Sequence, residues 1–178
     1  MKIYSVIPDF DHFDTCSLDR GPSIFRFNGR SVENDWTPLR VKRYNEGPLG
    51  SFISHLGRDA IILEKSAIDK LYPLMRNVEI LPLNCNFGDY WVVNVLDVLR
   101  CVNYDQSNYR TLAGKCADGR PRIYWFDKIA FFPECIEGYH IFKTVDCPAG
   151  AIYVDDEFVG EVKKHGITGF SFQAVWEG

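Results

Sequence analysis

The stretch "AIYVDDEFVGEVKKHGITGFSF", residues 151–172, contains the clearest secondary-structure pattern in the chain. Its apolar start is followed by Asp155, a favourable N-cap residue, and by two more acidic residues, which suit the positive end of a helix dipole. Apolar residues then recur at helical spacing up to Gly166, a residue type that often terminates helices. The stretch therefore predicts a strand, a helix that starts at Asp155 and ends before Gly166, and a second strand.

The same pattern occurs 91 residues earlier, in "AIILEKSAIDKLYPLMRNVEIL". When the two segments are aligned, Glu64 falls on Asp155 and Leu71 falls on Val162. The agreement lies in the pattern more than in residue identity. Two interpretations stay open: the chain repeats a strand–helix–strand unit, or two unrelated units share a common pattern.

The rest of the chain predicts mostly strands. The longest apolar run, 90–102, is rich in β-branched and aromatic residues, which favours a central strand or a strand with a bulge over a helix. Pro73 is expected to end or kink a helix near Tyr72. The expected elements are strands at 2–7, 23–27, 78–83, 90–102, 122–132 and 140–144, an isolated strand near 39–44, a helix at 64–75 and a single turn at 133–136.

These elements predict one α+β domain over residues 1–178, with a mixed, mostly antiparallel sheet and short helices. Strands 78–83, 90–102 and 122–132 are expected at its centre. A length of 178 residues suits one domain or two very small ones, and 46% hydrophobic residues provide a sizeable core.

Charge and hydropathy exclude several classes of protein. A net charge of −4 argues against a non-specific nucleic-acid binder, which needs a basic surface, but it is compatible with a basic protein partner. The N-terminus lacks an apolar stretch of signal-peptide length, and no segment approaches the ~20 apolar residues that span a membrane. We therefore expect a cytoplasmic protein that binds neither nucleic acid nor membrane.

The sequence contains no recognised catalytic motif. HExxH, GxSxG, GxGxxG and the Walker A pattern are all absent. The six cysteines are scattered and form no CxxC pair, which favours free thiols over disulfides or a zinc site. We expect no catalytic residue, no cofactor and no bound metal.

Two polar segments are candidates for a functional surface. "DFDHFDTCSLDR", residues 9–20, gathers four aspartates around His12, but it lacks the glycine and distal glutamate of an EF-hand loop, which favours a solvated loop over a cation site. "NYDQSNYR", residues 103–110, predicts a turn, and its tyrosines are residue types favoured at protein contacts. The candidate partner-binding residues are Asp9, Asp11, Asp14, Tyr104, Asp105 and Tyr109.

Several short motifs within residues 48–174 are informative through their order and spacing. Their residues are Tyr90, Asn94, Val95, Ser107, Ile141, Phe142, Ile152, Tyr153, Val154, Phe158, Thr168, Gly169 and Phe172. In this arrangement, residues 48–174 resemble a bacterial immunity-protein family of polymorphic toxin systems, the eleventh of the numbered immunity families and formerly a domain of unknown function. The chain departs from the family pattern at Glu64 and Asp155, where serine is usual, at Ser51, where aspartate is common, and at Asn103, where aspartate is expected.

The resemblance implies a protein that binds and neutralises a cognate toxin domain by occlusion, without chemistry of its own. The acidic charge suits a basic toxin, such as a nuclease. Two alternatives stay open: a small enzyme or ligand-binding domain that uses the 9–20 loop, and a non-catalytic scaffold or regulatory interaction domain.

Overall fold

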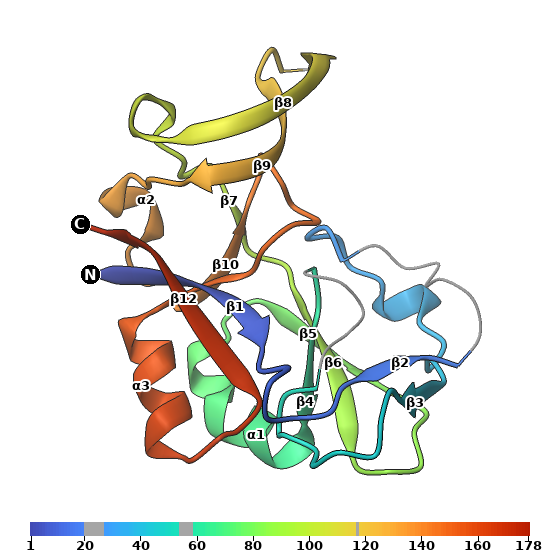
Figure 1. Ribbon diagram of the computed structural model, residues 1–178. Helices are drawn as coiled ribbons and strands as arrows, with labels where there is room; N and C mark the ends of the chain where they lie inside the picture. Colours follow the sequence, from blue (N-terminus) through green and yellow to red (C-terminus); the bar gives the residue numbers. More distant parts are fainter. Residues whose placement is uncertain (20–26, 54–58, 117) are drawn as a thin grey trace.

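The computed structural model describes residues 1–19, 27–53, 59–116 and 118–178. These residues form a mixed α+β fold of short helices and mostly antiparallel strands in several sheets (Figure 1). This fold class confirms the prediction from the sequence. The elements are β1 (Lys2–Pro8), β2 (Cys16–Leu18), η1 (Glu33–Asp35), β3 (Val41–Arg43), β4 (Ile61–Glu64), α1 (Lys65–Leu71), η2 (Tyr72–Leu74), β5 (Val78–Pro82), β6 (Tyr90–Val95), β7 (Val98–Leu99), η3 (Tyr104–Gln106), β8 (Asn108–Lys115), β9 (Pro121–Lys128), α2 (Pro133–Ile136), β10 (Ile141–Thr144), β11 (Tyr153–Asp155), α3 (Asp156–Lys164) and β12 (Phe170–Glu177).

The strands of the described residues form two larger sheets and two strand pairs. One sheet has the order β12-β1-β11-β10-β7, and the other has the order β4-β6-β5. Strands β2 and β3 form one pair, and β8 and β9 form the other. All pairings between these strands are antiparallel except that of β10 with β7.

The predicted strand–helix–strand unit is present at both positions, and the two copies share one topology. In the first, β4 and β5 lie on either side of β6, and both run antiparallel to it. In the second, β11 and β12 flank β1 in the same way. Helices α1 and α3 contact each other, side by side in Figure 1. Each unit is therefore a split β-α-β unit with an antiparallel strand inserted between its two strands.

The two helices bury the apolar faces that their sequence spacing predicts. Ile68 and Leu71 of α1 lie in the same core cluster as Phe158 and Val162 of α3. All four side chains are almost fully buried. Burial of this kind is the main stabilising term for short helices, which are marginal in isolation.

The predicted helix boundaries are confirmed, and their causes are local. The Asp155 carboxylate accepts a hydrogen bond from the backbone N–H of Phe158 at 2.9 Å, as an N-cap should. Gly166 has φ +62°, the left-handed conformation that follows the end of many helices. Pro73 lies in η2, where α1 tightens into a 3-10 turn.

The prediction of one continuous strand over 90–102 is wrong. Strand β6 ends at Val95, and β7 begins at Val98 in the other sheet. The N–H of Leu96 still bonds to the Asn77 carbonyl, in register with the β5–β6 ladder. The chain changes sheets at the next residue, because the Asp97 carbonyl accepts from the N–H of Lys143 in β10. An apolar run alone cannot distinguish a long strand from two short ones in different sheets.

Two of the three predicted central strands are not central. Strand β5 pairs only with β6, at the edge of its sheet. The segment 122–132 contributes β9, which pairs with β8 in a largely exposed hairpin because its aromatic residues do not all face a core. The predicted strands at 2–7 and 140–144 and the turn at 133–136 are confirmed. The strand expected near 39–44 is present as β3, but it pairs with β2 and is not isolated. Residues 23–26 of the predicted strand 23–27 lie outside the described residues.

Candidate functional site

The acidic loop after β1 carries two surface aspartates. The backbone N–H of His12 donates to Asp9 Oδ1 at 3.3 Å, and the His12 ring nitrogen Nδ1 lies 2.9 Å from the same oxygen. The hydrogen bond between the Asp9 carboxylate and the His12 ring lowers the pKa of Asp9 and raises the pKa of His12 relative to their ordinary values. Asp11 is exposed beside them. In this loop Asp11 is exposed and Asp9 is half-buried, with His12 as the local counter-charge of Asp9.

Asp14 has a different position from the other two. It is 5% exposed, and its carboxylate accepts hydrogen bonds from the backbone N–H groups of Thr15 and Asn45, at 2.8 and 2.9 Å. Arg43 Nε lies 3.2 Å from the other carboxylate oxygen. Asp14 therefore fixes the conformation of the loop against β3 from beneath the surface.

The turn at 103–110 has the local hydrogen bonds that its sequence predicts. The Asn103 side chain accepts from the backbone N–H of Asp105 at 3.1 Å, which leaves the Asp105 side chain on the exposed side of η3. The Ser107 hydroxyl donates to the Asn103 carbonyl at 2.6 Å and accepts from the Ala130 N–H at 2.9 Å. Ser107 thus joins the start of β8 to the chain that leaves β9.

Tyr104 and Tyr109 lie together but are half-buried. Their rings are edge-to-face with centroids 5.8 Å apart, and Tyr109 meets Phe126 of β9 in the same way at 6.1 Å. The Tyr104 hydroxyl donates to Asp146 Oδ1 at 2.5 Å. Burial, followed by this hydrogen bond, raises the pKa of Tyr104 to about 12. Both tyrosines mainly pack the β8–β9 hairpin onto the body.

The structure brings Tyr104, Asp105 and Tyr109 together, but it separates them from Asp9, Asp11 and Asp14. In Figure 1 the loop after β1 lies in the lower half of the molecule, whereas the turn before β8 lies at the top. The six predicted residues therefore define two surfaces, not one.

Sequence reasoning missed the hairpin and the ion pairs that hold its turn. Arg120 Nη1 lies 2.6 Å from Asp146 Oδ1, and Arg120 Nε lies 2.6 Å from Asp118 Oδ2. Arg100 reaches the same Asp118 oxygen at 3.2 Å. A signal for the hairpin was present, because Asp118-Gly119 is a strong turn dipeptide between two segments with strand-forming residues. The ion pair between Arg120 and Asp146 could not be predicted from neighbouring residues in the sequence.

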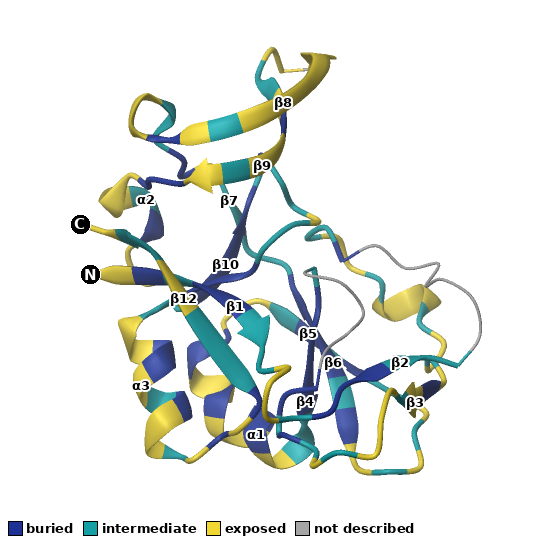
Figure 2. Ribbon diagram, in the orientation of Figure 1, coloured by how far each residue is buried: buried dark blue, intermediate teal, exposed yellow. Residues whose placement is uncertain are grey.

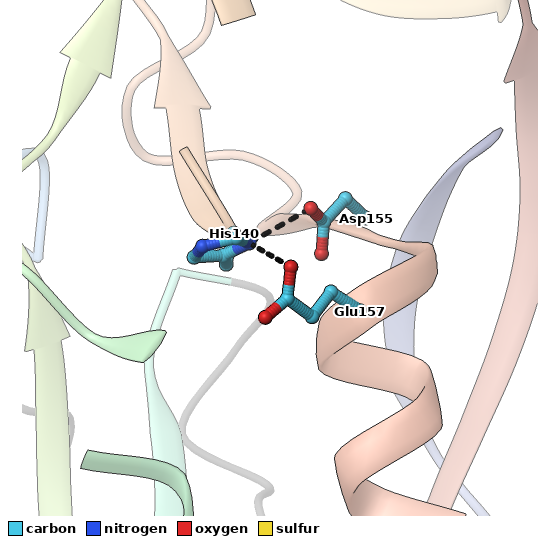
Figure 3. A group of neighbouring side chains, drawn as sticks. All are labelled: His140, Asp155 and Glu157. Atoms are coloured by element: carbon cyan, nitrogen blue, oxygen red, sulfur yellow. Dashed lines mark hydrogen bonds and ion pairs between the residues drawn. The ribbon is translucent and has the colours of Figure 1, made fainter. Parts of the chain in front are cut away.

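Among the residues that the structure describes, His140, Asp155 and Glu157 alone form a group with metal-ligand spacing (Figure 3). His140 Nδ1 lies 2.9 Å from Asp155 Oδ2 and 3.8 Å from Glu157 Oε2. The other oxygen of Asp155 caps α3, whose N-terminal partial charge disfavours a cation. The three polar side chains satisfy one another, and the group is accounted for as a helix cap with a histidine counter-charge.

Two buried charged groups outside these segments hold the body together. Lys143 is fully buried, and its ammonium donates to the backbone carbonyls of Phe27 and Asp59. Burial lowers its pKa to about 8. The Glu79 carboxylate accepts from Ser31 Oγ, the Val32 N–H and the Asn94 side chain. Through these bonds, Lys143 and Glu79 hold the chain segments that precede β4 against the sheets.

The polar clusters described above thus act as tethers, helix caps and turn contacts within the described residues. The six cysteines, all within the described residues, are not joined by disulfide bonds. Cys16 is fully buried, whereas the side chain of His12 is 75% exposed and bonds to Asp9. No helix formed by these residues has both the length and the apolar character needed to cross a membrane.

Comparison with protein families gives a match to the Immunity protein family (Imm11) over residues 84–177. The matched region begins just after β5, runs through β12 and covers more than half of the chain. The chain belongs to this immunity-protein family, which confirms the resemblance. A search of curated proteins finds no match.

Proposed function

We propose that the protein binds a cognate bacterial toxin domain and neutralises it by covering its active site, without chemistry of its own. Family membership over residues 84–177 is the observation that carries the proposal, because immunity proteins of this kind imply a toxin partner and are typically non-catalytic. The tethering roles of the polar clusters support it.

The toxin that best fits the whole chain is a basic protein, such as a nuclease, met in the cytoplasm. The net charge of −4 would accelerate encounter with a basic surface and orient it, more than it would add affinity. Asp9, Asp11 and Asp105 are the predicted carboxylates that lie near or at the surface. Tyr104 and Tyr109 would add contact through their exposed edges, and Asp14 would act by shaping the loop.

The alternative of an enzyme or ligand-binding domain centred on the 9–20 loop has less support. Asp9 pairs with His12 and Asp14 pairs with Arg43. Within the described part of the chain, the carboxylates of this loop are not grouped at metal-ligand distances. The loop is therefore better suited to a contact with a protein surface than to holding a cation.

Co-expression tests the proposal. Expression of the toxin domain encoded beside this chain should arrest growth, simultaneous expression of the chain should restore it, and the two proteins should copurify. Absence of a complex at micromolar concentrations of both purified proteins would contradict the proposal.

A further inference from the structure

The β8–β9 hairpin is the most exposed strand pair among the described residues. Seven of the eight residues of β8 and five of the eight of β9 are exposed. Figure 2 shows the pair at the edge of the molecule, whereas the strands of the two larger sheets are mostly buried or of intermediate exposure. An isolated two-stranded ribbon is marginally stable in water, so an exposed ribbon of this length must be held by the body or by a partner.

The pairing register assigns the side chains of the hairpin to two faces. Residues opposite each other share a face, and neighbours along a strand alternate. Thr111 is opposite Ile123, which is 7% exposed, so this pair lies on the inner face. The next pair along the ladder, Leu112–Arg122, therefore lies on the outer face. Arg110 and Trp125 pair beyond a register shift, and the exposure of both side chains places them on the solvent side as well.

The outer face combines apolar area with positive charge. Leu112 is 50% exposed and Trp125 is 42% exposed, while the side chain of Arg110 is 60% exposed. Tyr124, at a register shift of the ladder, is 49% exposed. Tryptophan, tyrosine and arginine are the residue types most enriched among binding hot spots.

The charge of the hairpin is opposite to that of the chain. Residues 108–128 contain five basic and two acidic residues, a net charge of +3, whereas the whole chain carries −4. Ion pairs within the described residues engage Arg110 with Asp127 and Arg120 with Asp118 and Asp146. Arg122 Nη1 donates to the Ala113 carbonyl at 3.2 Å, which leaves its charge without a counter-ion among the described residues. Lys115 and Lys128 likewise form no ion pair with a described residue, so all three charges can face an acidic surface.

The hairpin is fastened at both ends. At its base, the Ser107 hydroxyl accepts from the Ala130 N–H at 2.9 Å, and Val102 forms a strand bridge with Phe131. At its turn, Arg120 reaches the buried Asp146 at 2.6 Å. A surface that is fixed before binding loses less conformational entropy when a partner docks.

We propose that the outer face of the β8–β9 hairpin docks onto a local acidic, partly apolar patch on the otherwise basic cognate toxin, an inference that rests on the proposed function. Trp125 and Leu112 supply the apolar centre of the contact, and Arg122 supplies the charge that selects the partner. A net charge of −4 for the whole chain favours a protein over a nucleic acid as the occupant.

The test measures binding kinetics between the purified chain and the catalytically inactivated toxin domain encoded beside it. Trp125→Ala should raise Kd by roughly 30-fold, mainly through faster dissociation. Arg122→Glu should slow association by about tenfold at low salt. Leu112→Glu serves as a second apolar variant, and circular dichroism checks that each variant is folded.

Two matched controls lie on the helical layer away from the hairpin. Tyr72→Ala removes an aromatic side chain that is 57% exposed, and Lys70→Glu reverses an exposed charge. Neither should change Kd more than twofold.

Each other outcome overturns the inference. If the wild-type chain binds and the hairpin variants bind equally well, the surface is wrong while the proposed function stands. Faster association of Arg122→Glu would mean a basic patch instead of an acidic one. If the chain self-associates and Trp125→Ala abolishes this, the face belongs to a contact with a second copy. If the chain binds duplex DNA and Arg122→Glu abolishes this, the face belongs to a contact with nucleic acid. Failure of the wild-type chain to bind the toxin removes the proposed function and this inference together.

Discussion

Asp146 connects the exposed hairpin to the body, and Asp146→Asn is the most informative stability variant. Its side chain is 1% exposed and accepts hydrogen bonds from Arg120 Nη1 at 2.6 Å and from the Tyr104 hydroxyl at 2.5 Å. A hydrogen bond to a charged group contributes about 1.5–3 kcal/mol, and a neutral one about 1 kcal/mol. Because Asn keeps the shape and one acceptor, the variant should lose about 2–3 kcal/mol of unfolding free energy.

Urea denaturation measures this loss as a lower midpoint at an unchanged slope. Asp127→Asn is the matched control, since it removes the charge from an ion pair on the same hairpin whose side chains are 60% and 44% exposed. Exposed pairs contribute at most about 1 kcal/mol, so this variant should change stability little. Equal midpoints for Asp146→Asn and Asp127→Asn would refute the claim that Asp146 is the tether.

Three further predictions concern the body. Leu71→Ala and Val162→Ala should each lower the unfolding free energy by roughly 2–3 kcal/mol in chemical denaturation, because both side chains are buried in one core cluster; unchanged midpoints would contradict the helix packing. Asp155→Ala should cost about 1 kcal/mol through loss of the N-cap hydrogen bond, measured in the same way, and a neutral effect would contradict the cap. Burial lowers the pKa of Lys143 from 10.5 to about 8, so between these pH values the unfolded chain binds more protons than the folded chain. The unfolding free energy should therefore rise with pH over this range, by about 3 kcal/mol. Lys143→Met should remove this rise, and an equal rise in both proteins would contradict the reasoning.

The parts of the fold that the sequence predicted well are those with local causes. Asp155, Gly166 and Pro73 act within a few residues of themselves, and each lies where its chemistry predicted. The shared pattern of the two strand–helix–strand segments also corresponds to a shared topology.

Non-local pairings could not be predicted in the same way. The two strands that flank β1 come from the opposite end of the chain, and nothing within residues 2–8 specifies them. The change of sheet at Asp97 depends on a partner about 46 residues away in the sequence. The buried roles of Lys143 and Asp14 also depend on distant carbonyl and N–H groups.

The candidate surface was predicted only in outline. Composition favoured tyrosine and aspartate as contact residues, but exposure depends on tertiary packing, and Tyr104 and Tyr109 are largely used to seat the hairpin. The exposed face of Leu112, Arg122 and Trp125 follows from a ladder register that includes irregularities, which a simple alternation of residues does not reveal.

The most direct test of the central claim is titration of the purified chain into an activity assay of the toxin domain encoded beside it. The account predicts that toxin activity falls linearly with added chain and reaches zero at a fixed stoichiometric ratio, with no covalent change in either protein by mass spectrometry. Full toxin activity in the presence of excess folded chain would contradict the account.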